Sequence, residues 1–547
     1  MTSVVRSNKF LLTALVLSVV IGGMSFANLP PALPATGIQT INGVTFDFSD
    51  YGLADHEVLA FFNYLYTLVS SEYQGYGEWD GWNFREELHG LAHYVLAFMT
   101  YATSTLFETT PGYRTDYYRS FAYDLIKRMN TTEDEWGTNS VEYWEWTHPE
   151  YNYNTYYWPN ATDPSGLYIG GFRGPANIMW TGHYTLMMTL YERNFHTGEM
   201  TDEITWFMDD WNNSLLTDGF GAPKDGGIWG VGLIPCEPYI VFAQCNSIPI
   251  FCTEMYDNLY GTNYRPMWDY GLNFINTVMQ DQYGLFIDGY YVSRPTSTYY
   301  NPDRLPATIP GPQQDLYLRD GTPKVSSYCD AWALDFLEYT QPEETAHDYP
   351  IFLQHFRKDL SGDMMYIVDT YTNTKGFGTF DILGSLFTLP LAKQRGDFVT
   401  RDRVLNFLMS LFNKVWSDDG RMMYVDTSSL EPFLESVLSF GYIWAKTPVT
   451  MRDLGDARPA DFWNYPYISA ADDDYIWVYQ AQWDPEKQGF ILNVRVDQTA
   501  TLTFSNFQSQ PTAYLHGVPL TTLTASGSDY TLTLEPGTYQ IVIVEGV

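Results

Sequence analysis

Cysteine is scarce in this chain, with four residues in 547, at positions 236, 245, 252 and 329. A fold of this size with so few cysteines does not depend on disulfide bonds, because domains built on disulfides carry many more per residue. No pair has the C-x-x-C spacing, and no histidine follows at the spacing of a zinc finger. The sequence therefore argues against a structural metal site, and we expect none.

Basic residues are also few, since 29 Lys and Arg stand against 65 Asp and Glu, a formal net charge of −36. A surface of this sign repels phosphate groups, which excludes nucleic acid and anionic lipid as partners. We interpret acidic runs such as ADDDY at 471–475 as solvated surface.

Only the N-terminus holds a long apolar run. Arg6 and Lys9 precede an apolar stretch over 10–23, and small residues precede a plausible cut after Ala27, which is the layout of a secretory signal. We expect 1–27 to be a signal peptide or, alternatively, an N-terminal anchor. The mature protein is then exported to the periplasm, the medium or the cell surface, with no membrane span and with 28–54 as a lead segment.

Aromatic residues are abundant at 17%, including 44 Tyr and 17 Trp, and 45% of the chain is hydrophobic. Large apolar faces with a polar tip suit a deep aromatic cavity or a surface on which sugars stack. The length predicts more than one structural unit.

Helical periodicity recurs between about 55 and 445. It predicts twelve helices, near 55–71, 87–106, 115–129, 176–195, 200–215, 243–259, 265–279, 326–338, 348–360, 381–395, 400–414 and 430–445. Twelve helices in consecutive pairs fit an (α/α)6 barrel, in which six inner helices surround a central funnel.

From about 475 the pattern changes to alternating β-branched and aromatic residues between turns, which predicts a small antiparallel β-sandwich. We therefore expect a mainly α protein, with the barrel at 55–450, a connector at 451–474 and a β-sandwich domain at 475–547.

Candidate reactive residues lie in three segments. In GPANIMWTGHYTLMMTLYE, at 174–192, Asn177 is a good helix cap and His183 lies in the first turns beside Met179. A histidine in this position is also commonly a core residue bonded to a backbone carbonyl. In SSYCDAWALDF, at 326–336, Tyr328 and Trp332 share one helix face, which is common in a core as well as in a cavity.

The segment IPCEPYIVFAQCNS, at 234–247, holds two of the cysteines. Flanking prolines keep Cys236 and Glu237 in a loop, whereas Cys245 begins the next helix, where the helix dipole favours an anion. Spacing alone leaves a disulfide between the two cysteines and a pair of free thiols equally open. Phe242, which lies between the two cysteines, would extend the aromatic surface formed by Tyr328 and Trp332. Cys252 is interpreted as a packing residue.

The string CEPYIVFAQCNS, followed by YDNLYGTNYR, resembles the core signature of the linalool dehydratase-isomerase family. The segments NIMWTGHYTLMMTLY, HYVLAFMTYA, SSYCDAWAL and GFGTFDILGSLFTLPLAKQRGD match that family in order, so the similarity spans about 55–445 and leaves out the β region.

This resemblance implies an (α,α)6 barrel that interconverts a tertiary allylic terpene alcohol with its primary isomer, and dehydrates it to a diene, without a cofactor. It also implies rings of subunits with sites at their interfaces. The implied catalytic group comprises the reduced thiols Cys236 and Cys245, the polar residue His183, the hydroxyl of Tyr94 and Glu237 after the first thiol. The implied substrate lining comprises Met179, Phe242, Tyr328 and Trp332.

The sequence departs from the family at two places. The family has an aspartate in its first helix that reaches a neighbour's site, and Tyr66 occupies that position here. Glu72 or Tyr73 would have to take over the role of the missing aspartate. We therefore add Tyr66 and Tyr73 to the residues that are candidates for contact with the substrate. The family's structural disulfide has no counterpart.

Three functions are consistent with these features. The leading one is a cofactor-independent hydro-lyase or hydroxyl-transferring isomerase that acts on a small apolar, terpenoid-like alcohol or alkene. A secreted polysaccharide lyase or glycosidase would instead need paired carboxylates, such as Glu237 with Asp330 or Asp381. A barrel without activity, having lost the family aspartate, is the third.

Overall fold

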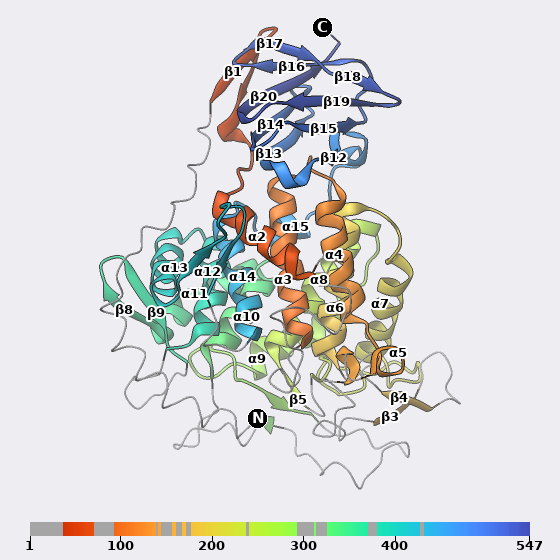
Figure 1. The fold of residues 1–547 in the computed structure, drawn as a ribbon. Helices are drawn as coiled ribbons and strands as arrows, with labels where there is room; N and C mark the ends of the chain where they lie inside the picture. Colours follow the sequence, from red (N-terminus) through yellow and green to blue (C-terminus); the bar gives the residue numbers. More distant parts are fainter. Residues whose placement is uncertain are drawn as a thin grey trace.

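The computed structural model describes residues 37–69, 92–137, 140–143, 156–159, 167–170, 177–236, 240–292, 311–312, 325–369, 380–426 and 432–546. They form a large helical part and a β region that stands on one end of it (Figure 1). In the described part, no helix has the length and apolar character that a membrane span requires.

Six helices pack side by side in chain order, and the last packs back on the first. This closed inner ring comprises α3 (Ala92–Thr109), α6 (Ile178–Phe195), α8 (Ala243–Tyr260), α10 (Ser327–Leu337), α12 (Ile382–Gln394) and α14 (Pro432–Lys446). Helix α6 is buried on almost every side. A helix that is apolar all round is one that is covered all round, which explains why these segments lack a polar face.

A second set of helices lies outside the ring: α2 (His56–Val69), α4 (Asp116–Met129), α7 (Thr201–Leu216), α9 (Asp269–Val278), α11 (Pro342–Phe356) and α13 (Phe398–Leu411). Four of them contact the inner helix that precedes them in the chain, namely α4, α7, α11 and α13, and α2 contacts α14. Their buried residues occupy one side, as in α9, where Gly271, Leu272 and Ile275 face inward. The prediction of a mainly helical domain is confirmed.

Short elements fill the connections. They are α5 (Glu133–Trp136), α15 (Met451–Gly455), the 3-10 helices η1 (Phe48–Asp50), η6 (Arg265–Trp268), η8 (Phe462–Asn464) and η9 (Asp473–Tyr475), and the paired strands β3 (Tyr156–Pro159) with β4 (Leu167–Gly170), β5 (Ile240–Val241) with β6 (Tyr290–Tyr291) and β7 (Gly311–Pro312), β8 (Arg357–Ser361) with β9 (Met364–Ile367), and β10 (Lys414–Trp416) with β11 (Met423–Val425).

The C-terminal region consists of two antiparallel sheets, in the strand orders β13-β14-β20-β16-β17 and β12-β15-β19-β18. The strands are β12 (Tyr467–Ala471), β13 (Ile476–Asp484), β14 (Gly489–Val496), β15 (Ala500–Ser505), β16 (Pro511–Leu515), β17 (Val518–Thr522), β18 (Thr524–Ser526), β19 (Asp529–Leu534) and β20 (Gly537–Glu545). Phe490 of one sheet meets Phe504 of the other edge to face, with centroids 5.5 Å apart. The expected β-rich C-terminus is confirmed, and its first strand, β12, lies within the segment predicted as a connector.

The segment predicted as a lead contributes to this β region. Strands β1 (Ile38–Ile41) and β2 (Val44–Asp47) form a hairpin, whose turn residues Asn42 and Gly43 both have positive φ, as a two-residue turn requires. Phe46 is buried against Ile491 of β14. The hairpin therefore covers a face of the five-stranded sheet, and β14 is buried on both sides.

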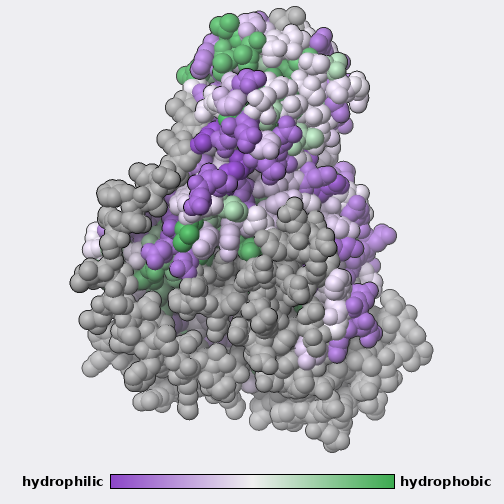
Figure 2. All heavy atoms as spheres, in the orientation of Figure 1, coloured by the Kyte–Doolittle hydropathy of each residue, from purple (hydrophilic) through white to green (hydrophobic). Residues whose placement is uncertain are grey.

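Exposed apolar side chains gather at the outer end of the β region, over β1 and β17, whereas polar side chains predominate nearer the ring (Figure 2). Ile38 and Val518 are 66% and 64% exposed, and Val44 and Leu520 are also exposed. Strand β17 is an edge strand with exposed side chains throughout.

The β region joins the ring at the C-terminal end of α3. Gly112 donates a backbone hydrogen bond to the carbonyl of Ala481 at 2.8 Å and accepts one from Ile468 at 2.8 Å. A Cβ at Gly112 would lie 2.8 Å from the ring of Phe490 and 2.9 Å from the Ala481 oxygen. The close approach of the two parts therefore requires glycine here.

Gly112→Ala is expected to lower the free energy of unfolding by about 1–3 kcal/mol, because the added methyl overpacks this junction. Denaturant unfolding measures the loss. Gly362→Ala is the matched control, since a Cβ there meets nothing within 4 Å. An equal effect of both substitutions would contradict the assignment of Gly112 as the tight contact.

His56 of α2 also lies at this junction. Its ring is 4.3 Å from that of Trp477 of β13, and its Nδ1 shares a hydrogen bond of 3.0 Å with the Tyr479 hydroxyl. Burial, with a smaller effect of the Arg495 cation, lowers the pKa of His56 to about 4. The imidazole is therefore neutral in the folded protein at neutral pH.

Because this pKa lies below the value of about 6.5 in the unfolded chain, the unfolded state binds the extra proton first as pH falls. The stability contribution is complete above pH 6.5 and is lost between about 6.5 and 4, by about 3 kcal/mol. We expect the free energy of unfolding of His56→Phe to fall less than that of the wild type over this range in urea titrations. Parallel curves for the two proteins would show that His56 does not carry the dependence.

Candidate active site

Cys236 and Cys245 lie together where α8 begins. Their Sγ atoms are 2.9 Å apart, both residues are at least 96% buried, and neither cysteine is in a disulfide bond. A covalent S–S bond would measure about 2.05 Å. Of the two alternatives that the sequence left open, the structure thus contains the pair of thiols in direct contact.

Asn246 brings the two thiols together. Its Oδ1 accepts a hydrogen bond from the backbone N–H of Ile234, and its Nδ2 donates to the carbonyls of Ile234 and Phe242, all at 3.0 Å. The loop that carries Cys236 is therefore tied to the first turn of α8, which carries Cys245. This role of Asn246 was not predicted, although an asparagine directly after a cysteine at a helix start is the signal that could have indicated it.

The same loop is tied to α6. The Ile178 N–H, in the first turn of α6, donates to the carbonyl of Pro235 at 3.0 Å. One turn further along, the two helices are in close contact, because a Cβ on Gly182 would lie 3.1 Å from Pro249. Helices α6 and α8 therefore start at the same end of the ring, with the thiols near that end and His183 deeper inside.

Aromatic side chains from the inner helices meet around His183. Tyr94 of α3 packs edge to face on the imidazole at 5.2 Å, and Phe98 and Trp332 lie at 5.6 Å, measured between ring centroids. Trp332 also stacks on Phe387 of α12 at 4.9 Å. We call these five residues the aromatic floor.

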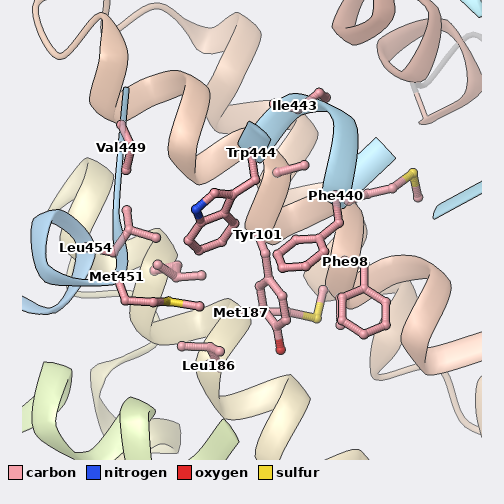
Figure 3. Close-up of a cluster of buried hydrophobic side chains, with 14 of the residues drawn as sticks. Phe98, Tyr101, Leu186, Met187, Phe440, Ile443, Trp444, Val449, Met451 and Leu454 are labelled. Carbon is pink, nitrogen blue, oxygen red and sulfur yellow. The ribbon is translucent and has the colours of Figure 1, made fainter. Parts of the chain in front are cut away.

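Two further rings, those of Tyr101 and Phe440, lie beside Phe98 (Figure 3). The structure therefore brings together three predicted site residues, Tyr94, His183 and Trp332. Phe98 and Phe387 were missed, because periodicity shows that a phenylalanine is buried but not which helices face each other.

His183 is 1% exposed, and its Nδ1 lies 2.7 Å from the hydroxyl of Tyr101. Burial, with a smaller effect of the neighbouring His93, holds its pKa well below the ordinary range, so the ring is neutral. Within the described part of the chain, His183 Nε2 and Trp332 Nε1 are buried and have no hydrogen-bond partner. Both nitrogens are available to form a hydrogen bond with a polar group of a ligand bound inside the ring of helices.

Tyr328 lies one helical turn before Trp332 and is half-buried. Its neighbour Cys329 raises the pKa of Tyr328 well above the ordinary value, together with burial, Asp288 and Cys245. Helix α10, which carries this phenol, is the neighbour of α8 in the ring.

Met179 and Phe242 are half-buried residues that pack on the same core. Met179 lies four residues before His183 on α6, so it is about one turn nearer the thiols. Phe242 immediately precedes α8 and gives its carbonyl to Asn246.

Other predicted residues are not brought to this place. Tyr66 lies on the outer helix α2, with its ring 4.3 Å from that of Tyr117 of α4. Burial raises its pKa, and Ser120 of α4 shares a hydrogen bond with it. Glu237 and Tyr73 lie outside the described residues.

Two of the carboxylates considered for a glycosidase, Asp330 and Asp381, make hydrogen bonds within the fold, although Asp330 Oδ2 is buried without a partner among the described residues. Asp330 is two residues from Trp332, on the other side of α10, and accepts a hydrogen bond from the Phe286 N–H at 3.0 Å. Asp381 caps α12 and accepts the Ser327 hydroxyl at 2.6 Å. Burial raises the pKa of Asp381 to about 6 and that of Asp330 well above its usual range.

Among the described residues, no three His, Cys, Asp or Glu side chains come together as a set of metal ligands.

Comparison with known proteins gives one match to a protein family. The model of the linalool dehydratase/isomerase family matches residues 229–300, a segment that includes both thiols and Asn246. The resemblance predicted from the sequence is confirmed over this part of the chain.

Three solved structures show a distant likeness. A family 105 glycoside hydrolase from C. acetobutylicum ATCC 824 is 10% identical, covers 70% of this chain and 99% of its own, and has a TM-score of 0.40. The unsaturated glucuronyl hydrolase from Bacillus sp. GL1 is 12% identical over 63% and 83%, with a TM-score of 0.36. A family 127 β-L-arabinofuranosidase from Geobacillus stearothermophilus T6 is 13% identical over 90% and 81%, with a TM-score of 0.36. Likenesses this distant carry no information about the reaction.

Proposed function

We propose that this protein is a dehydratase or isomerase of small apolar allylic alcohols that works by thiol chemistry without a cofactor. The observation that carries the proposal is the contact at 2.9 Å of two buried cysteine sulfurs that are not joined by a disulfide bond, in the segment that matches the linalool dehydratase/isomerase family. The side chains of the aromatic floor, inside the same ring of helices, provide an apolar surface for such a substrate.

Loss of water from an allylic alcohol needs a proton for the departing hydroxyl and a base for the proton that carbon loses. One thiol gives its proton to the oxygen while the C–O bond breaks, and water leaves with the bonding electrons. The other sulfur, as thiolate, takes the proton from the resulting allylic cation, which becomes a diene. After this step the first sulfur has lost a proton and the second has gained one. Because the two sulfurs are in contact, the proton can pass back from the second to the first.

Isomerisation follows if water instead adds to the other end of the allylic cation and the sulfur that gave its proton to the leaving hydroxyl takes the extra proton back from the new C–O oxygen. The aromatic faces of Trp332 and Tyr94 favour positive charge nearby, because the face of an aromatic ring is negative. A thiol pair also avoids placing a carboxylate or an ammonium group in an apolar site, where burying such a localised charge costs free energy.

No specific observation favours a glycosidase. That reaction needs two carboxylates on opposite sides of one sugar bond. Asp330 and Asp381 already bind Phe286 and Ser327 within the fold.

The test uses the full chain, purified under reducing and anaerobic conditions. It is incubated with linalool and geraniol in one arm and with a panel of glycans in the other. We expect diene in the headspace or the isomeric alcohol in solution, and no release of reducing sugar. Sugar release without any terpene product would overturn the proposal.

A further inference from the structure

The hydrogen bond between Tyr101 and His183 joins two buried rings from neighbouring helices, α3 and α6. The hydroxyl of Tyr101 lies 2.7 Å from Nδ1, the ring planes are within 18° of parallel, and both residues are 1% exposed. Figure 3 shows Tyr101 packed beside Phe98, Phe440 and Met187. The phenol therefore has little freedom to turn away from the imidazole.

The direction of this hydrogen bond follows from what else the hydroxyl can reach. Within the described residues, the Tyr101 hydroxyl has no other hydrogen-bond partner. If Nδ1–H donated to the phenol oxygen, the buried O–H would lack an acceptor, at a cost of about 1–3 kcal/mol. Burial and the nearby Cys252 raise the pKa of Tyr101 well above its ordinary value, so this O–H keeps its proton.

From this geometry we infer that Tyr101 is a positioning residue, which donates to Nδ1 of His183 and holds the imidazole as the Nε2–H tautomer. A neutral imidazole carries one proton, and it must lie on the nitrogen that does not accept. Nε2 is also the nitrogen without a hydrogen-bond partner among the described residues. The ring nitrogen of His183 that has no partner among the described residues is therefore a hydrogen-bond donor.

The consequence for catalysis depends on the proposed function. An Nε2–H group can hold the oxygen of the alcohol, but it has no lone pair with which to take a proton from carbon. The base is then a sulfur of the thiol pair, and His183 orients the hydroxyl. The resemblance grouped His183 and the two cysteines as one catalytic set. The tautomer assigns the base to the cysteines and the orientation of the hydroxyl to His183.

Histidine labelled with ¹⁵N and ¹³C provides the direct test, because the two ring nitrogens resonate differently when protonated and unprotonated. The protein has nine histidines, and the His183→Gln variant identifies the signal of His183. We expect a single neutral Nε2–H tautomer near pH 7 in the wild type and a mixture of tautomers in Tyr101→Phe. Tyr184→Phe is the matched control, because it removes a hydroxyl bonded to Glu203 from the same helix as His183.

An Nδ1–H tautomer or an imidazolium in the wild type would overturn the inference, and so would an unchanged tautomer in Tyr101→Phe. In the activity arm, kcat of Tyr101→Phe is expected to fall about tenfold with little change in KM, since the hydrogen bond is worth about 1–3 kcal/mol. If the wild type has no terpene activity, the proposed function fails while the spectra still decide the tautomer.

Discussion

Replacing Cys236 or Cys245 with alanine is expected to lower kcat for dehydration by about 10²–10⁴-fold, the usual value of a positioned acid or base. Each thiol depends on the other for return of the proton, so the double variant should lose little more than either single one. Steady-state rates of diene formation, measured on protein with an unchanged unfolding midpoint, check this result.

Cys252→Ser is the matched control. Cys252 is buried on the same helix, and its sulfur lies 3.3 Å from the Thr189 hydroxyl, a partner that serine can keep. We expect it to retain most of its activity. Full activity of Cys236→Ala beside a wild-type control, or an equal loss in Cys252→Ser, would show that the thiol pair does not perform the reaction.

Removing the side chain of Asn246 is expected to separate the two thiols. Asn246→Ala leaves the N–H and the carbonyl of Ile234 buried without their partner, which costs about 3 kcal/mol of the free energy of unfolding. The loop that carries Cys236 can then move relative to α8. A displacement of about 1 Å is enough to lower activity about 100-fold in the folded protein.

Ser247→Ala is the companion variant, because Ser247 is equally buried but its hydroxyl bonds, among the described residues, to the Gln244 carbonyl in its own helix. Its expected cost is about 1 kcal/mol, with activity retained. Urea unfolding gives the stabilities, and the rate of a thiol–disulfide cross-link under mild oxidation reports the approach of the sulfurs. If Asn246→Ala forms that cross-link as fast as the wild type, the role assigned to Asn246 is wrong.

The helices of the ring could be predicted from the sequence because each is a long apolar segment with clear ends. The expected helix at 243–259 is observed as Ala243–Tyr260, and the one at 176–195 as Ile178–Phe195. The segment predicted at 348–360 is less accurate, since α11 spans Pro342–Phe356. Its first turn carries Pro342 with two glutamates, a good helix start, and the later Pro350 is tolerated inside the helix.

The site was predictable only where one segment carries it. The segment 234–247 contains both thiols and Asn246, which ties them together, so the resemblance to the family could identify this part of the site. The aromatic floor combines four inner helices, and the partner of His183 is Tyr101, which the sequence does not distinguish from other buried tyrosines. Export, signal cleavage and subunit rings stay predictions.

The hairpin β1–β2 has a consequence for how the molecule is made. It is bonded to the last strand of the chain, with Gln39 donating to the carbonyl of Gln540, 501 residues away. At about 5–20 residues per second, a ribosome needs roughly 25–100 s to cover that distance. Phe46 therefore leaves the ribosome long before the sheet that buries it exists, and the ring can form in the interval. The hairpin can therefore take its place on the sheet only after residues 489–545 have been made.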